Sequence, residues 1–529
     1  MSAYFDTKND HLISKLSDIL GKESVITEES EREFYSIDVY SKDKICAAVV
    51  RPINKELLKK AIPYVAKSGY SIIVRGGGMS YTKGYVPTKE DTIIFDVSLL
   101  NQIIEINETD MYITVESGVT WKEIYEKLKP TGLRLPFFGT FSGIRATVGG
   151  GLSQGALFMG TARYGQAADI LLSMEILLPD GTIIKTGQSA FKNSKPFYRT
   201  YGPDLNGLFI HDGGSLGIKT QATFRLISAP KETDYLTFLF PDVSSACLSL
   251  SQVAKSGAAE EAYVFDPVST RKNLSTLNIK EELKTIASVA KNQSSIKKGI
   301  FDATKLVLSG RDFVKEDMYS LHIVCAGRSS SSVRDDIKLI REICGKNKAE
   351  EIPNSIPKAV RSNPFKPLNG VIGSDGDRWV ALNAKVPHSH SNKIINEADK
   401  ILEKYKAEMN GLGVTVSRLF IAIGTHAFSY EPVFHWHDSW LPIHRKIPEE
   451  NYINKIKEPK ANTKATELVE QLRREMVQLF ADLGASSNQI GKTYLYSEML
   501  NPNTLGLLKS IKKYVDPDSQ LNPGVIGLN

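Results

Sequence analysis

The stretch Val74-Arg-Gly-Gly-Gly-Met-Ser-Tyr81 decides the fold, and it follows a β-branched segment, Tyr70-Ser-Ile-Ile-Val74, that predicts a strand. Three successive glycines lack Cβ atoms, so the backbone can take positive φ angles and bring its amides close to a ligand. Such a run suits a phosphate or pyrophosphate, and Arg75 would add positive charge. The spacing is neither GxGxxG nor GxxxxGK[ST], so neither a Rossmann dinucleotide fold nor a P-loop is indicated.

Two further glycine-rich segments give this loop its context. Thr147-Val-Gly-Gly-Gly151 precedes an apolar run that turns at Pro179-Asp-Gly181, which is typical of a hairpin. His211-Asp-Gly-Gly-Ser-Leu-Gly-Ile218 precedes another predicted strand. Three unrelated tight turns are the alternative interpretation. Because each segment lies at the edge of a predicted strand, we expect loops that together line a groove for an extended ligand.

Helices and strands alternate around the first glycine loop. Asn54 is placed to cap a helix that ends near Lys67, and Thr92-Ile-Ile-Phe-Asp96 predicts a further strand. Segments 103–106 and 111–115 predict a strand pair. The short connections between these elements indicate an α+β or α/β domain.

The motifs of this region stand in a fixed order along the chain: Arg51-Pro52, Arg75 to Ser80, Phe95-Asp96, Val115 with Gly118-Val119, Thr147-Val-Gly-Gly150, Arg163-Tyr-Gly165, Pro179-Asp-Gly181, Ser215-Leu-Gly-Ile218 and the tail Val515 to Gly524. Taken together, they resemble the FAD-binding domain of the vanillyl-alcohol oxidase and p-cresol methylhydroxylase superfamily. Within that superfamily, the nearest likeness is to FAD-dependent D-lactate and glycolate dehydrogenases.

The resemblance implies an α+β fold with a p-cresol methylhydroxylase type of FAD-binding domain and a substrate cap. We expect the FAD-binding domain over residues 1–230, in two subdomains split near 115. The cap, itself α+β, is expected over residues 231–470. A C-terminal segment, 471–529, should return to the FAD-binding domain.

The resemblance also implies which residues contact the FAD. The expected contacts are the pyrophosphate loop Arg75, Gly76, Gly77, Gly78, Met79 and Ser80, then Gly118, Val119, Thr147, Val148, Gly149, Gly150, Gly217, Ile218 and Asn522. Two positions depart from the family pattern. Met79 replaces the histidine of covalent members, so FAD should be non-covalent at this loop, while a link through the cap stays open. Val525 stands where a basic residue usually follows Asn-Pro-Gly.

The segment Ile421 to Trp440 of the predicted cap is rich in histidine. In an extended chain His435 and His437 lie on one face and the neighbouring aromatic side chains on the other, with His426 and Tyr430 upstream. An imidazole could take the hydroxyl proton of an alcohol while a hydride passes to the flavin. A divalent metal on His435 and His437 is the second interpretation, although the histidine-containing Gly-Asp-Gly-Asn segment of metal-binding relatives is absent. Structural or exposed histidines are the third.

Two arginines are candidates for binding a substrate carboxylate. Arg378 and Arg361 could each clamp it through a bidentate contact. A surface salt bridge is the alternative for both.

The resemblance implies an FAD-dependent oxidoreductase that oxidises an alcohol carbon, and we expect a D-2-hydroxy acid such as D-lactate, or glycolate, as the first substrate class. A para-hydroxybenzylic alcohol oxidase or p-cresol-type dehydrogenase is the first alternative, because Tyr201 to Phe209 resembles that branch equally well. An ether-lipid synthase of the same superfamily and a non-enzymatic flavin binder are further alternatives. The electron acceptor stays open.

Composition bounds the remaining properties. The chain has 529 residues and a net charge of +6 spread along its length, so nucleic acid is not expected as a partner, and a homodimer is left open. Four cysteines without CxxC spacing, Cys46, Cys247, Cys325 and Cys344, predict reduced core thiols. No apolar stretch approaches the ~20 residues of a membrane span, and a cytoplasmic location is expected.

Overall fold

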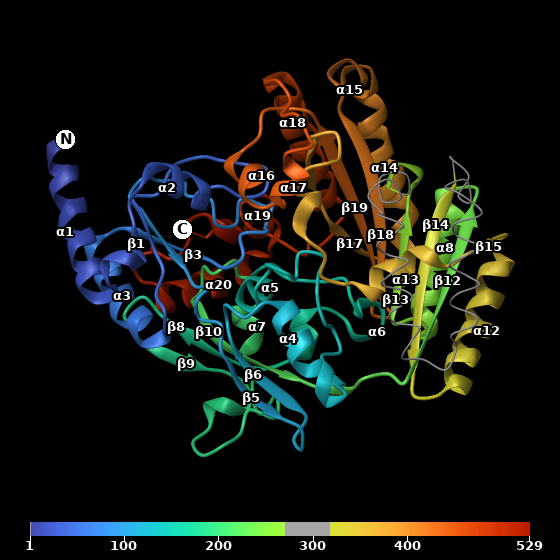
Figure 1. Ribbon diagram of the computed structural model, residues 1–529, viewed down its shortest axis with the longest axis horizontal. Coiled ribbons are helices and arrows are strands. Elements are labelled where there is room, and N and C mark those ends of the chain that lie inside the picture. Colours follow the sequence, from blue (N-terminus) through green and yellow to red (C-terminus); the bar gives the residue numbers. More distant parts are fainter. Residues whose placement is uncertain (1, 270–317, 529) are drawn as a thin grey trace.

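The computed structural model describes residues 2–269 and 318–528, and it consists of two regions side by side. Figure 1 shows the N-terminal half on the left and a large sheet with its helices on the right. The structure therefore confirms the predicted mixture of helices and strands. Part of the predicted cap, residues 270–317, lies outside the described residues.

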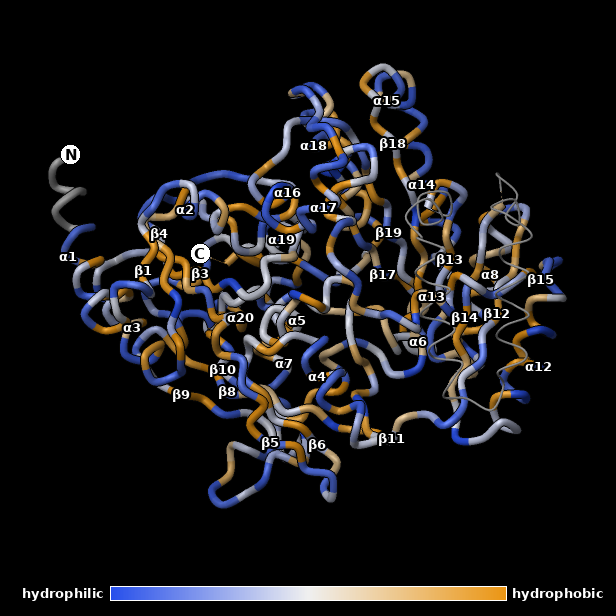
Figure 2. Tube along the Cα trace, in the orientation of Figure 1, coloured by the Kyte–Doolittle hydropathy of each residue, from blue (hydrophilic) through white to orange (hydrophobic). Residues whose placement is uncertain are grey.

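The first sheet holds the first glycine loop at a strand end. Its order is β1-β2-β4-β3, with β2, β4 and β3 parallel and β1 antiparallel. The strands and their helices are β1 (Val25–Ile26), β2 (Ala48–Val50), β3 (Ser71–Arg75), β4 (Thr92–Asp96), α1 (Ser2–Leu20), α2 (Glu29–Tyr35) and α3 (Lys55–Ser68). As predicted, Asn54 caps α3, since its side chain accepts a hydrogen bond from the Leu57 amide at 2.9 Å. Hydrophobic residues gather along β3 and β4 (Figure 2).

The second sheet is antiparallel, in the order β5-β6-β10-β8-β9. Its elements are β5 (Ile103–Asn107), β6 (Tyr112–Glu116), β8 (Leu171–Leu177), β9 (Ile183–Lys185), β10 (Ile218–Arg225), α4 (Trp121–Leu128), α5 (Val148–Gln154), α6 (Thr161–Tyr164) and α7 (Asn206–Phe209). The chain passes from the first sheet to the second between β4 and β5. Residue 115, near which the sequence predicts the split into subdomains, lies in β6.

The predicted cap is built on an eight-stranded sheet, β15-β12-β14-β13-β18-β19-β16, with β17 also pairing to β19. Its strands are β12 (Glu232–Phe240), β13 (Glu261–Phe265), β14 (Tyr319–Gly327), β15 (Glu350–Ile352), β16 (Arg378–Ala381), β17 (Ala384–Pro387), β18 (Thr415–Ile423) and β19 (Ala427–Trp436). Its helices include α8 (Val243–Ser256), α12 (Ser330–Lys346), α13 (Ser355–Ser362), α14 (Ser391–Lys404), α15 (Lys406–Leu412), α16 (Pro442–Lys446), α17 (Glu450–Ile453) and α18 (Thr463–Asp482).

The two faces of the cap sheet have different neighbours. Phe420 and Phe428 pack with residues of α8, α14 and α18 in one hydrophobic core. Leu419 and Ile421, on the opposite face of β18, instead join the core of the second subdomain. Side chains alternate between the faces of a strand, so every second residue of β18 and β19 faces the N-terminal half.

The C-terminal segment returns to the first sheet beside β3. A bridge joins Ile72 to Leu521, and the Asn522 amide donates to the Ile72 carbonyl at 2.8 Å. The helices α19 (Tyr496–Met499) and α20 (Pro502–Val515) belong to this segment. Helix α18 packs in the hydrophobic core of the cap sheet and ends at Asp482.

Two expectations from composition can be compared with the described residues. All four cysteines are buried and free, which confirms the prediction of reduced core thiols. Among the helices of the described ranges, none has the length and apolar content that crossing a bilayer requires.

Candidate functional site

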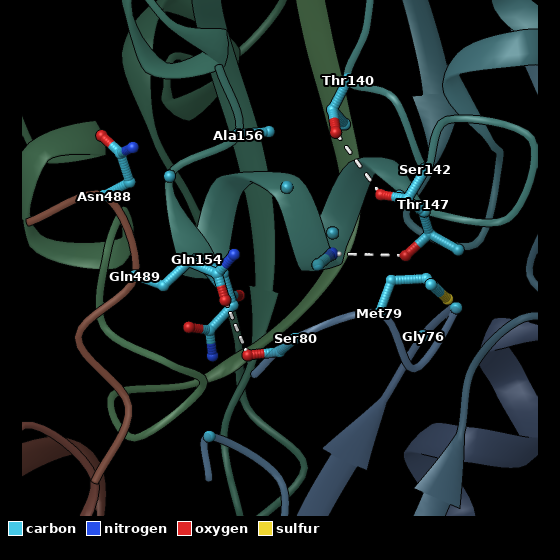
Figure 3. Close-up of a pocket in the computed structure, with 18 of the residues that line it drawn as sticks. Gly76, Met79, Ser80, Thr140, Ser142, Thr147, Gln154, Ala156, Asn488 and Gln489 are labelled. Atoms are coloured by element: carbon cyan, nitrogen blue, oxygen red, sulfur yellow. Dashed lines mark hydrogen bonds between the residues drawn. The ribbon is translucent and has the colours of Figure 1, made fainter. Parts of the chain in front are cut away.

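A cavity lies between the N-terminal half and the cap, and three glycine-rich segments form much of its wall. Its lining includes ten of the predicted cofactor contacts: Gly76, Gly77, Gly78, Met79, Ser80, Thr147, Gly149, Gly150, Gly217 and Ile218. Figure 3 shows Gly76, Met79 and Ser80 on one strand-to-loop segment, facing Thr147. The structure thus brings together loops that are far apart in the sequence.

The first loop fits the phosphates of a dinucleotide. The backbone amides of Gly76, Gly77 and Gly78 donate no hydrogen bond to any described group, so three donors at the cavity wall are available to an anion. A Cβ at Gly76 would overlap Thr147, and one at Gly77 would overlap the Arg145 carbonyl. The loop can therefore pack this closely against the second glycine segment only because its residues are glycine.

The sequence predicted that Arg75 contacts the cofactor, but its side chain lies outside the cavity lining. Its guanidinium is buried behind the loop, 4.8–5.4 Å from the ring centroids of Phe34, Tyr35 and Tyr85, and does not line the cavity. A Cβ at Gly78 would overlap it, so it supports the loop from the rear. No described carboxylate forms an ion pair with Arg75. Its charge would reach a bound phosphate through the loop, without direct contact.

The second glycine segment is a helix and not the loop that the sequence indicated. Residues 148–154 form α5, and the Thr147 side chain accepts a hydrogen bond from the Gly150 amide at 3.3 Å (Figure 3). A Cβ on Gly149 would overlap Ser117, and one on Gly151 would overlap Trp121. The glycines allow α5 to pack closely against Ser117, just after β6, and against Trp121 at the start of α4, and α5 presents its first turn to the cavity.

Four other predicted cofactor contacts do not line the cavity. Val119 and Val148 lie in the hydrophobic core, and Gly118 packs against the carbonyls of residues 97–100. The Asn522 side chain donates to the carbonyl oxygens of Gly84 and Gly213, at 2.6 and 2.7 Å. Asn522 therefore holds two lining residues in place from behind.

The histidines of the cap lie outside the cavity lining. His435 and His437 share a face of the chain as predicted, but His435 contacts Ser417 through Nε2 at 2.8 Å and Asp377 through Nδ1 at 3.2 Å. The His437 side chain is half exposed and lies 3.5 Å from Asp375. His426 is exposed at the turn between β18 and β19.

Tyr430, Arg378 and Arg361 also lie away from the cavity. Tyr430 is buried on the helix-covered face of β19, in the core of the cap. Arg378 donates to the Tyr40 carbonyl at 2.7 Å and pairs with Asp438 at 3.3 Å. Arg361 pairs with two buried glutamates. Both guanidinium groups are therefore occupied by protein acceptors.

In the described part of the chain, the predicted metal pair His435 and His437 does not form a metal-binding group with other side chains. Within residues 2–269 and 318–528, no group of three or more histidine, cysteine, aspartate or glutamate side chains is arranged to hold a metal ion. The second interpretation of His435 and His437 therefore lacks a coordination site in the described part of the chain.

The cap contributes a residue that the sequence analysis missed. Glu431 on β19 lines the cavity together with Trp379, Leu419 and Ile421. Burial raises the pKa of Glu431 to about 7, and one hydrogen bond from Asn383 partly opposes that rise. The available signal was an ionisable residue within an otherwise uncharged stretch, Phe428-Ser-Tyr-Glu-Pro-Val-Phe434.

The C-terminal segment supplies another part of the wall. Ser80 donates a hydrogen bond to Gln489 at 2.8 Å, and Asn488 lies beside it in the lining (Figure 3). The charged lining residue Lys219 is paired with Asp212 at 2.6 Å. The cavity therefore draws on both subdomains, the cap and the C-terminal segment.

Comparisons with known proteins agree with this architecture. The FAD binding domain family matches residues 46–187, and the C-terminal domain of FAD linked oxidases matches residues 229–526. D-lactate dehydrogenase [cytochrome] 1, mitochondrial, of Saccharomyces cerevisiae is 29% identical over 260 residues, 47% of this chain and 43% of the relative. Glycolate oxidase subunit GlcD of Bacillus subtilis is 27% identical over 240 residues, 45% of this chain and 49% of the relative.

The chain thus spans about half the length of these curated relatives. Among solved structures, p-cresol methylhydroxylase with substrate bound superposes with a TM-score of 0.73 at 18% identity, covering 99% of this chain and 97% of that one. This similarity confirms the predicted fold. Since the oxidase C-terminal domain alone matches more than half of the chain, directly after an FAD-binding domain, the protein belongs to the FAD-linked oxidases, a family of FAD-dependent enzymes.

Proposed function

We propose that the protein oxidises the carbinol carbon of a small alcohol, with a D-2-hydroxy acid such as D-lactate, or glycolate, as the first candidate. Support for the substrate class comes from the two relatives, one a D-lactate dehydrogenase and the other a glycolate oxidase subunit. Bound FAD would supply a two-electron acceptor for the hydride of the substrate.

The shared cavity is the observation that carries the proposal. One wall consists of the glycine-rich segments, whose free amides at Gly76 to Gly78 would hold the cofactor phosphates. The opposite wall is the cap sheet, where Trp379, Leu419 and Ile421 form an apolar surface around one carboxyl group. A substrate between the walls would be shielded from water by these side chains, which strengthens polar contacts to it.

A para-hydroxybenzylic or other neutral aromatic alcohol is the second candidate, and the charge of the lining favours it. Among the described lining residues, the charged side chains are Lys219, which is already paired with Asp212, and Glu431. A buried substrate carboxylate would require an unpaired cation. The rings of Tyr81, Phe158 and Trp379 would suit an aromatic substrate better.

A panel of alcohols tests both candidates. The FAD-loaded protein is mixed without oxygen with D-lactate, L-lactate, glycolate and para-hydroxybenzyl alcohol, and the visible flavin absorbance is followed. Loss of the oxidised-flavin absorbance with D-lactate or glycolate would support the first candidate, and loss with the aromatic alcohol alone would replace it by the second. An unchanged spectrum with every alcohol would contradict the proposed oxidation and favour a flavin site without net redox chemistry.

A further inference from the structure

Among the described residues that line the cavity, Glu431 is the only one with a carboxyl group. It lies near the middle of β19, opposite Leu419 of β18, and its side chain is on the face of the sheet turned toward the N-terminal half. No ion pair with a lysine or arginine is found for it in the described ranges. Its polar contact is the Asn383 side-chain amide, whose nitrogen lies 3.4 Å from Oε2.

Asn383 is itself held in a defined position. Its side-chain nitrogen donates to the Ser429 hydroxyl at 2.7 Å, and its backbone amide donates to the Tyr494 hydroxyl at 2.7 Å. Ser429 lies two residues before Glu431 on the same strand face. Asn383 is therefore a positioning residue that steadies one carboxylate oxygen, while no described group hydrogen-bonds the other.

His435 occupies the same strand face four residues further on, but its ring is already engaged. Both ring nitrogens have protein partners, Ser417 and Asp377, and the residue does not line the cavity. A general base must reach the proton that it removes. On this ground the geometry favours Glu431 over the histidine that the sequence suggested.

We propose that Glu431 is the general base that removes the hydroxyl proton of the substrate alcohol. This inference rests on the proposed function. The O–H bond breaks with its proton passing to the Glu431 carboxylate, and bound FAD would accept the hydrogen of the C–H bond together with both bonding electrons. The remaining electron pair on oxygen forms the carbonyl bond of the product, so atoms and charge balance. The proton then leaves Glu431 to solvent.

The surroundings of Glu431 suit this role near neutral pH. Desolvation disfavours the charged carboxylate, and this burial raises the pKa of Glu431 to about 7. The titratable neighbours across the cavity and the C-terminal segment are Tyr81 and Tyr494, whose own pKa values are raised by burial, so both stay neutral. Below pH 7 Glu431 is mainly protonated and cannot accept a proton. Flavin reduction should accordingly speed up as pH rises through about 7.

The test compares Glu431→Gln with His435→Asn in the FAD-loaded protein. Glutamine keeps the size of the side chain and removes its basicity. We expect E431Q to retain FAD but to reduce it about 10²–10⁴-fold more slowly, the range for a lost general base, and to lose the rise in rate with pH. H435N should keep that rise. The exposed Glu408→Gln on α15 is the matched control for removing one carboxylate from the cap.

An infrared titration of the FAD-loaded proteins without substrate gives a second readout that does not depend on turnover. Wild type and H435N should show the carbonyl stretch of a buried, protonated carboxyl that disappears as pH rises through about 7. E431Q should lack this band. Its persistence in E431Q would show that another group titrates there and would overturn the assignment.

The outcomes separate this inference from the proposed function. If alcohols reduce wild type and E431Q at the same rate and with the same pH dependence, Glu431 is not the base, although the enzyme is an alcohol oxidoreductase. If H435N alone loses the pH-dependent rise, the base is His435. If no alcohol reduces the wild-type flavin, the proposed oxidation fails and the base role fails with it.

Discussion

Among the described residues, Glu431 has no cationic partner for its buried carboxyl group, and this burial affects the stability of the protein as well as the proposed chemistry. The pKa of Glu431 is raised from 4.5 to about 7 by burial, so the folded protein binds this proton more tightly than the unfolded chain does. The stabilisation that the folded protein gains by binding this proton more tightly is fully present below about pH 4.5. It is lost progressively as pH rises through 7, where the folded protein must hold a buried charge.

Removing the charge should therefore stabilise the protein in alkaline solution. We expect Glu431→Gln to raise the free energy of unfolding at pH 8 by up to about 3 kcal/mol, since each pKa unit corresponds to about 1.4 kcal/mol. At pH 4 the variant should show no such gain. Denaturant titrations at both pH values measure the difference, and an equal effect at the two would mean that the carboxyl is not desolvated.

At the scale of single elements, the glycine loop after β3 depends on close approach of two backbones. A valine at position 77 would overlap the Arg145 carbonyl and push the loop away from α5. We expect Gly77→Val to lower the FAD content of the purified protein severalfold. Gly345→Val is the matched control, because a Cβ at that position on α12 meets no atom within 4 Å.

FAD content is measured as flavin released by acid precipitation per mole of protein. Met79 offers no imidazole for a covalent link, so acid should free the flavin of the wild type. Full FAD occupancy in Gly77→Val would refute the assignment of residues 76–78 as the phosphate loop. Flavin that stays with the wild-type precipitate would instead reveal a covalent link elsewhere.

In strand β19, neighbouring residues point to opposite faces, so a shift of one position decides whether a side chain enters the cap core or faces the cavity. Its even-numbered positions, including Phe428 and Tyr430, enter the cap core, and odd-numbered Glu431 faces the cavity. The alternation of side chains between the two faces of the strand could be predicted from the sequence, and His435 and His437 do share a face. Which stretch of that face borders the cavity depends on where β19 lies against the other domain, and this moved the candidate base from the histidines to Glu431.

At the scale of the whole molecule, a buried group of charges joins the cap to the N-terminal half. Arg134 of β7 (Leu133–Arg134) pairs with Glu260 at 2.5 Å, and Arg361 of α13 pairs with both Glu260 and Glu261. The two arginines together keep the pKa of the Glu260 carboxyl below its usual value in spite of burial. These ion pairs tie the cap to the N-terminal half of the chain.

Breaking this group should destabilise the whole protein. Arg361→Ala would remove the arginine partner of buried Glu261 and leave buried Glu260 with Arg134, at a cost of about 3–5 kcal/mol in the free energy of unfolding. Thermal unfolding of the variant and of the exposed control Arg474→Ala on α18 measures the difference. A shift no larger than that of the control would show that the ion pairs contribute little to stability.

The sequence alone determined the fold class and FAD as the cofactor, because the order of its glycine runs and strand patterns resembles a known family. It also predicted most of the loop that we propose for the FAD phosphates. It also determined that the cysteines are buried thiols. Only the tertiary structure decided which side chains reach the cavity. Arg75 and the histidines carry charge or a titratable ring, but where these side chains point depends on packing between strands and domains. Glu431 became a candidate through burial against a distant segment, and burial is a property of the folded chain.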